Sequence, residues 1–324
     1  MPKGKLVLFD EGGLNGSIDY QSFTKTTKLN YTNKEATFPI DVLIKPCKFY
    51  LIIQIKREKD YLPRWRVWLD NFSLTKEFKP NFEAEIDDSY ILSTIIYDLT
   101  PIIKEGKHEI TISHPSIRTI SILNVSTVTF YEIEGFNTKY KLAVGPLILN
   151  AHEKITLPLL DKSYFVIKNE GKSSILKLLD NNGGIIYNST PSIDSDEVEV
   201  EGKNVITAML ESSNEKDYGV ILSAYSITEK VPNIKVSVES KIDGSYIILN
   251  LKNESEVDLD KLILNIMING IQAHYKSFNN IKVNSSFEFR VPLQSAQNKK
   301  SVITIRVVGI KGGYRHIVDK QINL

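Results

Sequence analysis

Strict alternation of apolar and polar residues constrains this chain more than any other feature of its sequence. Nearly every apolar segment is short and rich in Ile, Val, Tyr, Phe and Thr, and helical periodicity is almost absent. Because successive side chains of a strand point to opposite faces, a period of two predicts half-buried β-strands. We expect strands at 5–10, 37–44, 49–56, 64–70, 108–113, 117–131, 163–168, 220–227, 234–238, 246–251, 262–268 and 302–308.

Clusters of Gly, Asn and Asp separate these segments. Gly and Asn tolerate a positive φ, so such clusters favour tight turns between strands. We expect turns at 10–13, 180–184, 243–244, 269–270 and 311–313. Many short strands at this spacing are typical of β-sandwiches and jelly rolls.

The length of 324 residues is more than one hydrophobic core usually serves, which predicts two or three domains. The runs 106–112, 202–208 and 299–305 each lead through a lysine into an Ile-Thr strand, and they follow one another by 96 and 97 residues. Coincidence among common residues is the alternative explanation. The sequence therefore predicts three tandem jelly-roll or immunoglobulin-like sandwiches, at 1–136, 137–231 and 232–324. We expect hinge freedom between them unless their seams are well packed.

Net charge and composition limit which classes of partner the protein can be expected to bind. The 40 Lys and Arg residues balance 39 Asp and Glu, so no overall field attracts nucleic acid or an anionic membrane. Cys47 is the single cysteine and cannot close an internal disulfide. The N-terminus lacks the apolar core of a signal peptide, and no later stretch has 18 apolar residues without a charge, so we expect no membrane insertion.

Sequence motifs for catalysis or metal binding are missing. Neither a Gly-rich phosphate loop nor a G-x-S-x-G elbow occurs, and the five histidines lack the spacing of a shared metal site. We therefore expect a protein that is not an enzyme, with no catalytic residues, no metal site and no cofactor.

An aromatic stretch provides the candidate binding residues. Alternation sends Trp65 toward the core, while Arg66 and Trp68 share the other face, with Tyr61 just upstream. Tyr61, Arg66 and Trp68 are therefore a candidate contact for a glycan or for a neighbouring subunit. The alternative is a cation–π pair in which Arg66 covers Trp68 within one chain.

Seven N-x-[ST] sequons point mildly to an externally exposed, glycosylated protein. They are Asn15, Asn30, Asn71, Asn124, Asn188, Asn253 and Asn284.

Three resemblances add to this interpretation. Residues 97–112 are similar to the strand, turn and strand of galactose-binding-type jelly rolls, and residues 253–270 resemble immunoglobulin-like adhesion modules. With its Ile, Lys and Asn bias and three-unit layout, the whole chain resembles the vertex turret proteins of turreted icosahedral viruses infecting Sulfolobus-type archaea.

The turret resemblance implies a structural virion protein, made in the host cytoplasm and located at the virion surface. It also implies a homo-oligomer with five-fold symmetry, contacts with the penton base and other capsid proteins, and host attachment, for example through a surface glycan. Residues 321–324 follow directly from an expected strand, so we expect the natural chain to continue.

Two alternatives remain open. One is a non-catalytic carbohydrate-binding or adhesion protein of an extracellular surface, and the other is an accessory β-sandwich part of a glycoside hydrolase.

Overall fold

The computed structural model describes residues 2–75, 77–292 and 301–323, and every regular element among them is a β-strand. The all-β class predicted from alternation is confirmed. Every segment expected to be extended contributes to a strand, although strand ends differ by a few residues. The chain divides into two compact units, Met1–Glu132 with Asn137–Glu229, and Ile133–Phe136 with Lys230–Leu324.

The first jelly roll of unit 1 begins at β3 and ends at β12. Its strands are β3 (Gly16–Phe23), β4 (Thr27–Leu29), β5 (Glu35–Val42), β6 (Lys48–Glu58), β7 (Arg66–Leu69), β8 (Phe72–Thr75), β9 (Phe82–Glu85), β10 (Tyr90–Asp98), β11 (Gly106–Ser113) and β12 (Ile120–Glu132). Inner sheet 1 has the order β3-β12-β6-β10-β9, with β4 also beside β12, and outer sheet 1 has the order β5-β11-β7-β8. Leaving out β4 and β9, this is the eight-stranded, two-sheet jelly-roll connectivity.

The second jelly roll repeats that connectivity strand for strand. Its strands are β13 (Asn137–Asn150), β14 (Lys154–Pro158), β15 (Lys162–Asn169), β16 (Ile175–Leu179), β17 (Ile185–Ser189), β18 (Asp196–Glu201), β19 (Val205–Glu211) and β20 (Tyr218–Lys230). Inner sheet 2 is ordered β13-β20-β15-β18 and outer sheet 2 is ordered β14-β19-β16-β17. The first two lysine-led runs found in the sequence lie on β11 and β19, which occupy equivalent places in the two outer sheets.

The N-terminal strands join inner sheet 2. Both β1 (Lys3–Gly4) and β2 (Val7–Leu14) pair with β13. The turn expected at 10–13 is therefore wrong, because these residues continue β2, with Gly12 opposite Tyr140. A β-carbon on Gly12 would lie 3.4 Å from the Tyr140 hydroxyl, so glycine here gives space to a ring across the sheet.

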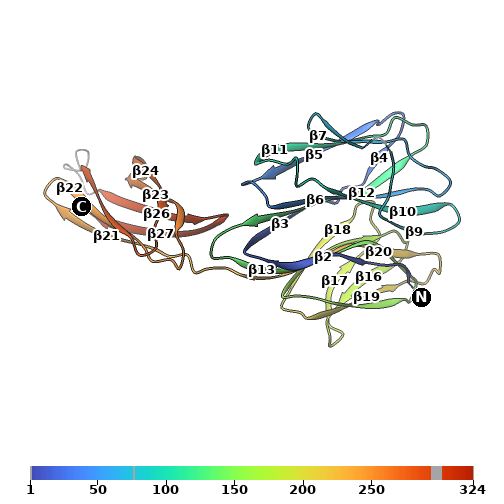
Figure 1. Cartoon of the computed structure of the whole chain (residues 1–324). Coiled ribbons are helices and arrows are strands. Elements are labelled where there is room, and N and C mark those ends of the chain that lie inside the picture. The colour runs from blue at the N-terminus through green and yellow to red at the C-terminus, as the bar shows by residue number, and fades with distance from the viewer. Residues whose placement is uncertain (1, 76, 293–300, 324) are drawn as a thin grey trace. The chain divides into compact units, whose positions relative to one another are not determined.

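The two inner sheets face each other, and their central strands are buried on both faces. On β6, Ile52 packs in the cluster with Val128 and Leu142 between the inner sheets, whereas Leu51 and Ile53 point to the opposite face and are also fully buried. In Figure 1, β5, β7 and β11 lie on one side of β6 and β12, while β13 and β20 lie on the other, with β16, β17 and β19 beyond them. The expectation of half-buried strands fails here because each inner sheet has a second sheet on its outward face.

Buried polar groups also cross the interface between the inner sheets. The Gln54 side-chain amide donates to the carbonyl oxygen of Leu222, and Asn124 donates to Gln54 Oε1 at 3.1 Å. The Tyr20 hydroxyl shares hydrogen bonds with Ser126 at 3.2 Å and Ser223 at 3.4 Å. Because a buried polar group without a partner is costly, these bonds favour one docking register of the two jelly rolls.

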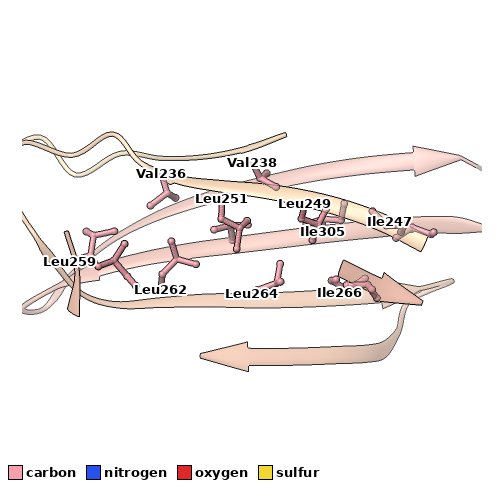
Figure 2. Close-up of a cluster of buried hydrophobic side chains, with 14 residues drawn as sticks. Val236, Val238, Ile247, Leu249, Leu251, Leu259, Leu262, Leu264, Ile266 and Ile305 are labelled. Carbon is pink, nitrogen blue, oxygen red and sulfur yellow. The ribbon is translucent and has the colours of Figure 1, made fainter. Parts of the chain in front are cut away.

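Unit 2 is an immunoglobulin-like sandwich of seven described strands. They are β21 (Val236–Asp243), β22 (Tyr246–Asn253), β23 (Leu259–Ile268), β24 (Ile271–Ile281), β25 (Ser286–Pro292), β26 (Val302–Lys311) and β27 (Tyr314–Asn323). A sheet ordered β21-β22-β25 packs on one ordered β24-β23-β26-β27. Figure 2 shows the core between them, where Leu249 and Leu251 face Leu262, Leu264 and Ile305.

The turns of unit 2 follow the sequence prediction. Gly244, Asn269, Gly270 and Gly312 all have φ between 52° and 82°, the left-handed region in which Gly and Asn are tolerated. The third lysine-led run reaches β26 from Ser301 onward, and its residues 299–300 lie outside the described residues. Because β26 belongs to a sheet of different connectivity, this run is not equivalent to the other two.

The short segment Ile133–Phe136, between β12 and β13, belongs to unit 2. The rings of Phe136 and Tyr314 lie 5.0 Å apart. The domain boundary expected after residue 136 coincides with the end of this segment. The boundary expected after residue 231 lies two residues inside unit 2, which resumes at Lys230. The structure separates two compact units, one of which holds both jelly rolls, and the three-domain boundaries stay a prediction.

Candidate functional site

The aromatic stretch on β7 lies as alternation predicts. Trp65 is buried, Arg66 is exposed and Trp68 is half-buried on the outer face of outer sheet 1. Tyr61 contacts a different group, since the Arg118 guanidinium lies 5.1 Å from its ring centroid and its hydroxyl donates to Ser116 Oγ at 2.8 Å. Tyr61 is thus held by Arg118 and Ser116, and a glycan or subunit contact at Tyr61, Arg66 and Trp68 stays a prediction.

The seven sequons divide by exposure. Asn15, Asn71, Asn188 and Asn284 are exposed, and Asn30 is half-buried. Asn124 and Asn253 are 0 % exposed, and their side-chain amides donate hydrogen bonds inside the protein. The fold therefore leaves no room for a glycan on Asn124 or Asn253, and glycosylation of the other five stays a prediction.

A cavity of about 660 Å³ beside outer sheet 1 contains a His–Asp pair. His108 Nδ1 lies 2.8 Å from Asp70 Oδ2, and its Nε2 lies 3.0 Å from the carbonyl oxygen of Lys104. Burial alone would raise the pKa of Asp70, but hydrogen bonds from His108 and the Glu109 N–H lower it. Both ring nitrogens have hydrogen-bond partners, so the pair ties the turn after β7 to β11. Local spacing in the sequence could not indicate this pair, because Asp70 is 38 residues from His108.

A second cavity is a cleft of about 880 Å³ in unit 1, at one end of the interface between the inner sheets. Residues near the ends of β4, β6 and β15 form its walls, together with the starts of β10 and β12 and the loops 170–172 and 191–193. Its volume is within the usual range of small-molecule sites, roughly 300–1,000 Å³.

An ion-paired network lies at the base of the cleft. Lys56 Nζ contacts Glu170 Oε2 at 2.9 Å and the Tyr218 hydroxyl at 2.8 Å. Lys168, which is 2 % exposed, lies 3.7 Å from Glu170 Oε1 and donates to the carbonyl oxygen of Ile193. The two lysines are thus held on either side of a single carboxylate.

Burial determines how these groups titrate. It lowers the pKa of Lys168, although Glu170 and Asp194 act in the opposite direction. Burial raises the pKa of Tyr218 to about 12, so this hydroxyl stays protonated and can donate to Glu170.

Apart from Asn30, which was a glycosylation candidate, sequence reasoning nominated none of the cleft residues. They come from segments up to 167 residues apart, between Thr26 and Ile193, and only folding brings them together. One local signal was available, because Lys168 follows the apolar run of β15 and is buried there. A lysine on a buried strand is uncommon unless it has partners.

Two further observations concern metals and membranes. The described residues contain no group of three or more His, Cys, Asp or Glu side chains placed to hold a metal ion. They also include no helix long and apolar enough to cross a membrane.

Comparison with known proteins adds little. No protein-family model and no curated protein sequence matches the chain. Among solved structures, a β-glucuronidase from Ruminococcus gnavus bound to N1-substituted uronic isofagomine is 8 % identical, with a TM-score of 0.22 over 59 % of this chain and 37 % of that one. A β-glucuronidase from Parabacteroides merdae is 10 % identical, with a TM-score of 0.24 over 60 % of this chain and 28 % of that one.

The chain thus spans only about a third of the length of these enzymes. At such low TM-scores the likeness carries no argument about function. The class that the fold itself defines is an all-β protein built from sandwich units, in which two jelly rolls precede an immunoglobulin-like sandwich.

Proposed function

We propose that this chain is a non-catalytic structural protein of an exterior surface, and specifically a turret protein at the vertices of a virion. The observation that carries the proposal is the pair of jelly rolls in unit 1, which are joined through inner sheets whose central strands are buried on both faces. Jelly rolls of this connectivity are common in viral capsid proteins and in lectins.

The joint between the jelly rolls suits a part that must keep its shape. Interfaces between domains of one chain are usually modest and polar, so relative motion is the ordinary expectation. Here aliphatic and aromatic side chains fill the interface, including Phe130 and Tyr225, and the bond from Gln54 to Leu222 crosses it. Bending would expose this apolar surface and break buried hydrogen bonds, so unit 1 should move as one body.

In this proposal the chain forms five-fold rings that sit on a penton base and contact other capsid proteins. It is made in the host cytoplasm and ends at the virion surface, where it contributes to host attachment.

Oligomer state and assembly test the proposal. The purified chain should form closed rings with five-fold symmetry in electron micrographs, and light scattering should give a matching mass. Co-expression with the capsid proteins of the same genome should place these rings at shell vertices. A chain that stays monomeric at every concentration and does not co-sediment with capsid shells would refute it.

A second candidate function is non-catalytic carbohydrate binding at an extracellular surface, which the cleft in unit 1 favours. The third, an accessory part of a glycoside hydrolase, requires that the chain raise the activity of a separate catalytic chain. Mixing the two chains and measuring hydrolysis distinguishes it from the others.

A further inference from the structure

The cleft of unit 1 carries an excess of positive charge although the whole chain is almost neutral. Its lining includes Lys28, Lys56, Lys168 and Lys172, against the carboxylates of Glu58 and Glu170, while the Arg57 that also lines it is neutralised by Glu83 at 2.6 Å. The chain as a whole has a net charge of +1. A concentration of one sign in a concave site focuses the field there and attracts ligands of the opposite sign.

Ion pairs within the protein leave much of this charge available. Glu170 is shared by Lys56 and Lys168, and Glu58 pairs with Arg118 at 3.2 Å. Both carboxylates are therefore already neutralised. Lys28 and Lys172 are exposed at the rim of the cleft, where a ligand can reach their ammonium groups.

At the base of the cleft, negative groups of the protein balance the positive charge of the Lys168 ammonium only in part. Lys168 has backbone carbonyl partners and only a distant carboxylate, at 3.7 Å, and its pKa is lowered by burial. An anion entering the cleft would supply the missing negative charge and favour the protonated ammonium.

The cleft is also built for more than a simple ion. Tyr90 is 42 % exposed, and the Lys56 ammonium lies 5.3 Å from its ring centroid. An exposed aromatic ring offers a platform for the apolar face of a sugar, and the lysine places a cation beside it. The hydroxyl groups of Thr119 and Ser121 line the same cavity and can hydrogen-bond to sugar hydroxyls.

The geometry points to a binding site for an acidic oligosaccharide, that is, a short glycan carrying carboxylate or sulfate groups. Lys28, Lys56 and Lys172 contact the anionic groups, Tyr90 stacks on a sugar ring, and Lys168 sets the positive base of the cleft. The site lies within unit 1 of a single chain, so it does not depend on ring assembly or on the turret proposal.

Calorimetric titration of the full chain tests this inference with four probes. Trigalacturonate and a sulfated galactotriose represent the two sources of negative charge, while neutral galactotriose and sodium sulfate separate the sugar from the ion. At least one acidic trisaccharide should bind more tightly than both neutral galactotriose and sulfate, and its affinity should fall as salt rises.

Two variants locate the site. The double substitution Lys28→Ala with Lys172→Ala should weaken binding about tenfold, because each exposed ion contact usually changes affinity by a factor of a few. The second variant, Tyr90→Ala, should by itself weaken binding several-fold. A matched control removes two other exposed lysines, Lys45 and Lys139, and should leave affinity unchanged.

Other outcomes overturn the inference. If neither acidic trisaccharide binds, or if galactotriose binds equally well, the charged cleft is not a site for acidic glycans. If sulfate binds as tightly as the trisaccharides, the site takes only a simple anion. Equal weakening in the Lys45 and Lys139 control would show a general charge effect. Ring formation measured on the same preparation tests the turret proposal separately.

Discussion

The hydroxyl of Tyr225 is predicted to destabilise unit 1, so its removal should stabilise the protein. Tyr225 is 1 % exposed between the inner sheets, and its hydroxyl has no hydrogen-bond partner among the described residues. Its ring stacks on those of Tyr20 and Tyr164, with centroids 5.5 and 5.8 Å away. Tyr225→Phe keeps these contacts and removes only the unpaired polar group.

The expected gain follows from the cost of burying an unpaired hydroxyl, about 1–3 kcal/mol. We expect the free energy of unfolding to rise by about 1–2 kcal/mol. The matched control is Tyr20→Phe, which removes a hydroxyl bonded to Ser126 and Ser223 and should cost about 1 kcal/mol.

Urea unfolding followed by tryptophan fluorescence measures this directly. Both tryptophans of the chain, Trp65 and Trp68, lie in unit 1, so their emission reports the unfolding of that unit. A Tyr225→Phe variant that is less stable than the parent chain would refute the reasoning, because it would mean that the hydroxyl makes a favourable bond.

Alkaline pH provides a second measurement of the same hydroxyl. Burial raises the pKa of Tyr225 above its ordinary value of 10.0. Stability from this group is therefore complete below about pH 10 and falls above it, because only the unfolded chain then releases the proton. The slope from one tyrosine is about 0.7 kcal/mol per pH unit at pH 10 and approaches about 1.4 kcal/mol per pH unit well above it. Between pH 10 and 11, stability should fall less steeply in Tyr225→Phe than in the parent chain; equal slopes would contradict the assignment.

Two further substitutions test the interface and the unit boundary. Asn124→Ala removes a fully buried amide bonded to Gln54 and should cost unit 1 about 2–4 kcal/mol in urea unfolding, whereas Asn188→Ala, at an exposed sequon, should change stability by less than about 0.5 kcal/mol. Similar effects of the two would argue against the buried network. Leu249→Ala should cost unit 2 about 2–5 kcal/mol, shifting part of the circular dichroism transition while the tryptophan transition stays in place. A shift of both transitions together would show that the units unfold as one.

Local steric rules explain the parts of the fold that the sequence predicted. The face of each residue on and next to β7 follows from extended-backbone geometry, so Trp65, just before the strand, was correctly placed inside and Arg66 outside. The turns at Gly244 and Asn269 follow from the few residues that accept a positive φ. These properties depend on neighbours within a few positions, and a linear pattern records them.

The double burial of β6 could not be predicted in the same way. Alternation says that Leu51 and Ile52 lie on opposite faces, but not that a second sheet covers the face of Ile52. The wrong turn prediction at Gly12 has the same origin. Gly12 lies in a strand because it pairs with Tyr140, which is 128 positions later in the sequence. The same limit applies to the candidate cleft, because only Lys168, after the apolar run of β15, has an unusual local sequence, and its partners come from distant segments.

The sequence by itself thus determined that the chain is extended, which residues share a face of each strand and where most hairpins turn, because those outcomes depend on backbone sterics over a few residues. Only the tertiary structure decided that two jelly rolls share a buried face and that lysines from distant segments line one cleft. Both features arise from contacts between segments more than a hundred residues apart, whose pairing depends on the packing of whole sheets.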